Sequence, residues 1–115
     1  MDLEAIRKYC LSLPHATEGI QWEDDLLFRI GGKMFTVCNL DGSSISFKCT
    51  PEEFEELILI DGIIPAPYMA RNHWVQIRKA NAVRTAELQR LIRTSYDMVR
   101  AKLPKKVRET LNRTG

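Results

Sequence analysis

The side chains that could support catalysis or metal binding are few and scattered. His15 and His73 are the two histidines, and neither belongs to a cluster with metal-ligand spacing. The acidic run Glu23-Asp24-Asp25 could hold a cation, but three consecutive side chains point in different directions, which favours a solvated loop. The serines lack a G-x-S-x-G setting, and no phosphate-binding loop is present. We therefore predict a protein that is not an enzyme and that has neither a metal site nor a cofactor.

The three cysteines do not indicate a disulfide framework or a zinc knuckle. Cys10, Cys38 and Cys49 are odd in number, and no Cys-x-x-Cys pair occurs. Each lies among apolar neighbours. Buried free thiols are the expected outcome.

The basic residues are the strongest functional signal. Residues 84–115 carry nine Lys/Arg and three Asp/Glu, a net of +6, whereas residues 1–83 carry eight Lys/Arg and twelve Asp/Glu, a net of −4. Such asymmetry fits an anionic partner for the basic part. Two interpretations stay open: a solvated helix face with a soluble tail, or a ridge that faces phosphates. The candidate nucleic-acid-binding residues are Lys33, Lys48, Arg71, Arg78, Arg93, Arg100, Lys105 and Lys106.

A second candidate region lies at residues 63–74, where aromatic and methionine side chains are of the kind enriched at interfaces. Its candidate partner or ligand patch is Tyr68, Met69, His73 and Trp74. The competing interpretation is that Ile63, Ile64 and Trp74 simply cover the core. A third option is a small-molecule site between the predicted sheet and the 65–74 loop, with polar groups from His73, Tyr68 and Arg71.

Helical periodicity predicts three helices that must position these residues. Asp2 caps a first helix that Pro14 ends. Thr50 caps a second, with proline next and Glu53 able to close a capping box, and this helix stops near Asp61-Gly62. Thr85 caps the longest, which runs to Pro104. Residues 105–115 form either a short last helix or a frayed tail.

Alternating apolar residues predict strands at 26–30, 34–40, 45–49 and 73–78. Gly31-Gly32 and Asp41-Gly42 supply the two hairpin turns. The 34–40 strand is apolar on both faces, so its register cannot be assigned from the pattern.

The segments between these elements are less regular. Residues 15–25 look mainly like a loop, with a short strand around Ile20–Trp22 as an option. Residues 63–72 contain two prolines and must be irregular or extended.

Length and composition place these elements in one α+β domain. The chain has 115 residues, 44% of them hydrophobic and 28% charged, with no apolar run long enough to span a membrane. The polar start shows no signal peptide, so we expect a cytoplasmic protein. The order helix, three-strand meander, helix, strand, helix predicts a two-layer architecture, with an antiparallel sheet and helices on one face.

Five stretches in order resemble the MmcQ/YjbR family over nearly the whole chain. They are Tyr-Cys-Leu-Ser-Leu-Pro-His-Ala-Thr-Glu (9–18), Gly-Gly-Lys-Met-Phe (31–35), Phe-Lys-Cys-Thr-Pro-Glu-Glu (47–53), Asn-His-Trp-Val (72–75) and Leu-Ile-Arg-Thr-Ser-Tyr-Asp-Met-Val-Arg-Ala-Lys-Leu-Pro-Lys-Lys (91–106). The resemblance implies a two-layer α+β fold similar in outline to secretion-chaperone and frataxin-like architectures. It also implies a small bacterial protein of a family described as DNA-binding, with no catalytic residues.

Two functional hypotheses follow. The first is a non-enzymatic DNA-binding protein that uses the basic residues of the C-terminal helix and the hairpins. The alternative is a protein-interaction or chaperone-like module, which could be a dimer, that uses the 63–74 loop.

Overall fold

The structure is a computed structural model and describes residues 2–114. Four α-helices, six strands and one short 3-10 helix occur in this part of the chain. Their order and bounds are α1 (Leu3–Ser12), β1 (Thr17–Gln21), β2 (Asp25–Ile30), β3 (Lys33–Asn39), β4 (Ile45–Lys48), α2 (Pro51–Leu57), β5 (Ile63–Pro65), η1 (Ala70–Asn72), β6 (Trp74–Ile77), α3 (Thr85–Ala101) and α4 (Lys105–Thr114).

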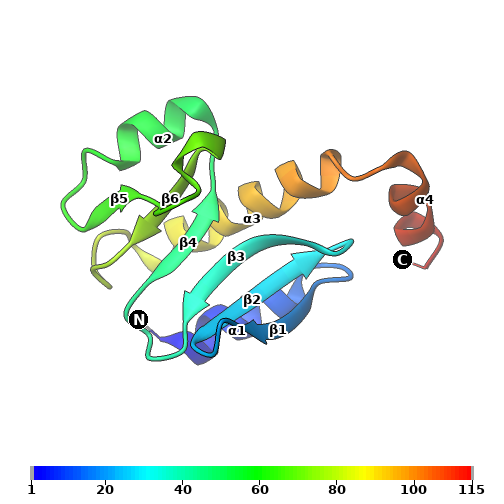
Figure 1. The fold of residues 1–115 in the computed structure, drawn as a ribbon, viewed down its shortest axis with the longest axis horizontal. Helices are drawn as coiled ribbons and strands as arrows, with labels where there is room; N and C mark the ends of the chain where they lie inside the picture. The colour runs from blue at the N-terminus through cyan, green and yellow to red at the C-terminus, as the bar shows by residue number, and fades with distance from the viewer. Residues whose placement is uncertain (1, 115) are drawn as a thin grey trace.

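The strands form one sheet in the order β1-β2-β3-β4-β6-β5, and every neighbouring pair is antiparallel. Residues of α1, α2 and α3 share one buried cluster with the inner face of this sheet, which confirms the expected α+β class with helices on one face. In Figure 1, α1 and α3 lie behind the sheet, and α4 lies beyond its end. None of the helices within residues 2–114 is long and apolar enough to cross a bilayer.

The segment 15–25, expected to be mainly a loop, contains β1 as a full strand paired with β2. The optional strand around Ile20–Trp22 overlaps β1 at Ile20 and Gln21. The full strand was missed because β1 is an edge strand with four of its five residues exposed, so it carries no apolar alternation. The predicted three-strand meander is therefore a meander of four strands. A second short strand, β5, lies in the 63–72 segment at the opposite edge.

Helix α2 begins as predicted, because the Thr50 Oγ1 accepts a hydrogen bond of 3.1 Å from the Glu53 backbone N–H. It ends at Leu57, earlier than the predicted end near Asp61-Gly62, and turns fill the interval. The N-cap of α3 is Arg84 and not Thr85, and no side chain caps this helix end. Residues 105–114 form helix α4, while residue 115 lies outside the described residues.

A β-bulge resolves the register of β3 that the sequence left open. Phe28 pairs with Thr36 whereas Arg29 pairs with Met34, so Phe35 is the extra residue. Phe35 therefore faces the main core although Val37, two residues later, faces outward. Without the bulge these two side chains would lie on one face.

The outer face of the sheet, opposite α1, α2 and α3, carries a second and smaller buried cluster. Leu27, Val37, Ala66 and Trp74 form it, with Met34 and Met69 packed against them. The loop between β5 and β6 supplies Ala66 and Met69 and so covers part of this face. The three thiols are all buried, as predicted.

Candidate functional site

Three lysines from separate elements meet at a pocket of about 280 Å³, here called the cationic pocket. Lys33 comes from the start of β3, Lys48 from the end of β4, and Lys102 from the C-cap of α3. Asn72 adds an amide, and none of the residues that line this pocket, all within the described chain, is acidic. Burial, and after it the charge of Lys102, lowers the pKa of Lys48. The pocket is thus a concentration of positive charge that nothing in its lining neutralises.

Lys33 and Lys102 are held near each other because the β2–β3 hairpin packs on the end of α3. The Gly31-Gly32 turn has positive φ at both residues, 58° and 83°, which turns the chain directly into Lys33. A Cβ on Gly31 would lie 2.5 Å from Leu103 Cδ1, so the hairpin rests closely on the end of α3 beside Lys102. A residue with a side chain would separate the two elements.

Lys48 is positioned through its backbone. The Ser95 hydroxyl of α3 accepts a 3.0 Å hydrogen bond from the Lys48 N–H and donates a 2.7 Å bond to the Phe35 carbonyl. Ser95 is fully buried. It therefore ties the bulge of β3 and the end of β4 to the same turn of α3.

A second pocket, of about 480 Å³, lies on the outer face of the sheet and is here called the aromatic pocket. Its floor includes Val37, Ser46 and Gln76, which are paired side by side across β3, β4 and β6. Trp22 borders it from the β1–β2 turn, and Tyr68 from the loop after β5. This pocket and the cationic pocket share Met34 as a lining residue.

Polar groups line the aromatic pocket beside its rings. Asn39, Ser44 and Gln76 contribute amide and hydroxyl groups, and Asp25 contributes a carboxyl. Partial burial, and after it the charge of Asp24, raises the pKa of Asp25. Asp25 thus belongs to β2 and to a pocket, whereas Glu23 and Asp24 are exposed as the solvated-loop prediction expected.

The backbone of the two aromatic residues is unusual. Trp22 has a φ of 53° and Tyr68 a φ of 67°, the left-handed region that bulky residues rarely adopt. Their side chains remain exposed, with relative accessibilities of 65% for Trp22 and 106% for Tyr68. Their rings therefore contribute little to the core that could offset the backbone strain.

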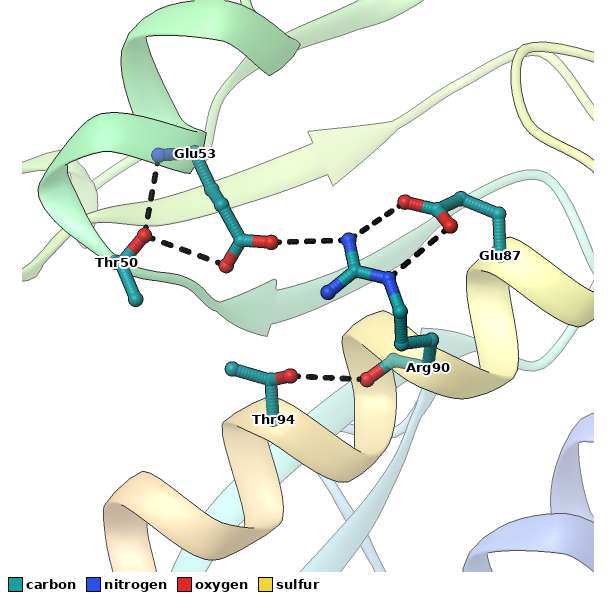
Figure 2. Close-up of polar contacts among 5 residues, drawn as sticks. All are labelled: Thr50, Glu53, Glu87, Arg90 and Thr94. Carbon is teal, nitrogen blue, oxygen red and sulfur yellow. Dashed lines mark hydrogen bonds and ion pairs between the residues drawn. The ribbon is translucent and has the colours of Figure 1, made fainter.

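The arginines of α3 do not join the cationic pocket. Figure 2 shows the Arg90 guanidinium between the carboxylates of Glu53 and Glu87, at 3.0 Å and 2.6 Å. Arg93 pairs with Asp97 at 3.1 Å. Arg100 donates to the Tyr96 hydroxyl and to the Asn112 side chain, each at 3.0 Å. The predicted ridge on α3 is thus occupied by contacts within the protein.

The remaining basic candidates are dispersed. Arg78 follows β6 at the end opposite Trp74 and donates to Gln76 at 2.7 Å. Arg71 is exposed in η1, next to Asn72 of the cationic pocket. Lys105 and Lys106 are exposed in the first turn of α4. Of the eight predicted residues, the structure brings Lys33 and Lys48 together in one pocket.

The predicted patch of Tyr68, Met69, His73 and Trp74 is divided by the fold. Tyr68 and Met69 line the aromatic pocket, while Trp74 is buried and lines the cationic pocket. His73 packs edge-on against Phe54 of α2, with ring centroids 5.5 Å apart. A pocket does lie between the sheet and the 65–74 loop, but neither His73 nor Arg71 is among the residues that line it.

Trp22 and Lys102 are the site residues that the sequence did not single out. Lys102 was one basic residue among many, and only the packing of α3 against the hairpin separates it from the others. Trp22 carried a usable signal, because a tryptophan between polar residues has no core pattern to explain it. Among the described residues, no group of three or more His, Cys, Asp and Glu side chains is arranged to hold a metal ion.

Comparisons with known proteins agree with the fold. A family model described as YjbR matches residues 11–98. A crystal structure of the Deinococcus radiodurans protein DR2400, with the family-model domain DUF419, is similar with a TM-score of 0.85 and 29% identity, covering 96% of this chain and 87% of that one. A Pseudomonas syringae protein is similar with a TM-score of 0.68 and 22% identity, covering 85% of this chain and 98% of that one. No curated protein matches.

Proposed function

We propose that this chain, which belongs to the YjbR family, binds nucleic acid and holds its phosphates in the cationic pocket. The observation that carries the proposal is the meeting of Lys33, Lys48 and Lys102 from three elements, with no acidic side chain in the lining. The experiment that tests this proposal starts with DNA oligonucleotides. The binding surface proposed here is the junction of the β2–β3 hairpin, β4 and α3, in place of the ridge on α3 that the sequence suggested.

Electrostatics supports a bound anion at this place. Burial, and after it the charge of Lys102, lowers the pKa of Lys48, so the charged form of Lys48 is disfavoured at this place. A phosphate between the ammonium groups would replace repulsion with attraction. Lysines bind phosphate as point charges without a fixed fork geometry, so such a site is tolerant of sequence.

The expected salt dependence follows from the number of lysines. Each phosphate neutralised on a single strand contributes a slope of about −0.7 to log affinity against log salt. If each lysine neutralises one phosphate, the slope is about −2. Raising the salt from about 50 to about 200 mM then weakens binding about 20-fold.

The test is a fluorescence anisotropy titration of labelled oligonucleotides at these two salt concentrations. Lys33→Gln, Lys48→Gln and Lys102→Gln should each weaken binding and make the slope shallower by about 0.7. Arg93→Gln is the matched control, because it removes the same charge from a residue that already pairs with Asp97. Absence of binding at low salt, or equal effects of Arg93→Gln and the lysine variants, would overturn the proposal.

For the alternative, a protein-interaction module, fewer residues of the 63–74 segment are exposed than the sequence suggests. Ile63 and Trp74 are 3% and 6% exposed, so they serve the core. Tyr68 is the fully exposed member of the predicted patch. Its ring borders the aromatic pocket together with Trp22.

A further inference from the structure

The aromatic pocket is not suited to bind a phosphate, because neither lysine nor arginine is among its lining residues. It offers instead two exposed rings and a floor with amide and hydroxyl groups. Its volume of about 480 Å³ lies in the range of small-ligand sites. This chemistry suits a flat, uncharged ring whose edge donates and accepts hydrogen bonds.

The two residues whose rings border the pocket have energetically unfavourable backbone conformations. Trp22 and Tyr68 both adopt left-handed backbone conformations and both expose their side chains. Residues held in this way are concentrated at ligand-binding sites, where the surrounding structure enforces them. Two such aromatic residues, from turns distant in sequence, border one pocket here.

The neighbouring charge decides which flat ring fits. Met34 lines both the aromatic pocket and the cationic pocket, so a ligand can place an aromatic group in one and an anionic group in the other. A nucleotide joins these two groups within one unit. A base stacked on aromatic rings beside a basic groove is the general mode of single-strand recognition.

We propose that the aromatic pocket receives an unpaired nucleobase of single-stranded nucleic acid whose phosphate lies in the cationic pocket. This inference rests on the proposed function. The side-chain amide nitrogens of Asn39 and Gln76 can donate to the edge of a base, while their oxygens already accept from the Asp41 N–H and from Arg78. The Asp25 carboxylate can accept from an exocyclic amino group. Bases within a duplex are stacked and paired and cannot enter the pocket, so single strands bind more tightly than duplexes.

Tryptophan fluorescence gives a direct measurement. The chain has two tryptophans, of which Trp22 is 65% exposed and Trp74 is 6% exposed. A base that stacks on Trp22 should quench its emission. The titrants are a short single strand, a duplex of the same length, an abasic strand with the same number of phosphates, and a nucleoside monophosphate.

The variants exploit the strained backbone. Trp22→Gly and Tyr68→Gly place glycine where φ is positive, so they should not lower thermal stability through backbone strain. Each should weaken single-strand binding by about 5- to 150-fold, the equivalent of losing one stacked base. Ile20→Ala is the matched control, because Ile20 is exposed on the same hairpin but is not among the residues that line the pocket. A purely structural role would lower stability and binding together.

The outcomes separate the two proposals. Weaker binding of the abasic strand and the duplex, with quenching of Trp22, supports the base pocket. Equal, lysine-dependent binding of the abasic and normal strands overturns the base pocket and leaves the proposed function standing. No binding of any oligonucleotide overturns both. A monophosphate that binds as tightly as the strand would assign the pocket to free nucleotides and overturn the single-strand inference.

Discussion

Ser95→Ala tests the attachment of α3 to the sheet. The wild-type hydroxyl is fully buried and satisfies two backbone groups, the Phe35 carbonyl and the Lys48 N–H. Alanine leaves both groups without this partner inside the protein. Each unsatisfied buried group costs about 1–3 kcal/mol, while the better helix propensity of alanine returns roughly 0.5 kcal/mol. The two unsatisfied groups together cost about 2–6 kcal/mol, so the expected net loss is about 1.5–5.5 kcal/mol.

Thermal unfolding followed by circular dichroism gives the measurement. With an unfolding entropy of about 2.1 cal/mol/K per residue, the whole domain has about 0.24 kcal/mol/K, so the melting temperature should fall by roughly 6–23 °C. The control is Thr94→Ala on the same helix. Figure 2 shows that the Thr94 hydroxyl bonds only the Arg90 carbonyl among the residues drawn. This exposed variant should stay within about 0.5 kcal/mol of wild type.

A loss below about 1 kcal/mol for Ser95→Ala would refute this account, because Ser95 satisfies the Phe35 carbonyl in a buried contact and the Lys48 N–H in a part-buried one, and each group left unsatisfied should cost at least about 1 kcal/mol. Affinity for oligonucleotides supplies a second measurement. Ser95 holds the Lys48 backbone, so a folded Ser95→Ala protein should bind more weakly than the Thr94→Ala protein at the same temperature.

Three further predictions follow from the same contacts. Gly31→Ala should destabilise the domain by about 1–3 kcal/mol in urea unfolding, because the new Cβ meets Leu103 at a φ of 58°, whereas Gly32→Ala, with nothing within 4 Å of its Cβ, should show only the backbone strain. Burial raises the pKa of the Cys10 thiol to about 12. The stability that the neutral thiol contributes is therefore complete below about pH 9, the pKa in the unfolded chain, and is lost as the pH rises toward 12. When the free energy of unfolding in urea is plotted against pH across this window, the line should be less steep in Cys10→Ala by up to about 1.4 kcal/mol per pH unit, and an unchanged steepness would contradict the burial. Arg90→Gln should cost at most about 1 kcal/mol in the same assay, because its ion pairs are half exposed, and it should leave oligonucleotide affinity within about twofold.

The amphipathic elements were predictable because their signals are local. Thr50-Pro51 marks the start of α2. The alternating apolar residues of β4 and β6, which are Ile45 and Phe47 and then Val75 and Ile77, face the main core. Where the local signal was absent, prediction failed. The exposed edge strand β1 has no apolar alternation, and the start of α3 has no side-chain cap.

The candidate site could be predicted only in part. Lys33 and Lys48 were named from sequence, but Arg93 and Arg100, which share a helix face, are occupied by Asp97, Tyr96 and Asn112 in the fold. Charge in a sequence says how many cations exist and cannot say which of them meet a carboxylate, because that depends on contacts between distant elements. The pairing of Arg90 with Glu53 is one such contact, between α3 and α2.

The sequence by itself determined the α+β class, the two glycine turns and the burial of the thiols, since hydrophobic periodicity and turn chemistry act over a few residues. The tertiary structure fixes which residues of β3 face the main core, through the bulge at Phe35. It also decided that Lys102 meets Lys33 and Lys48, and that Trp22 and Tyr68 border one pocket. Those arrangements depend on close packing of segments far apart in the chain, which no local pattern encodes.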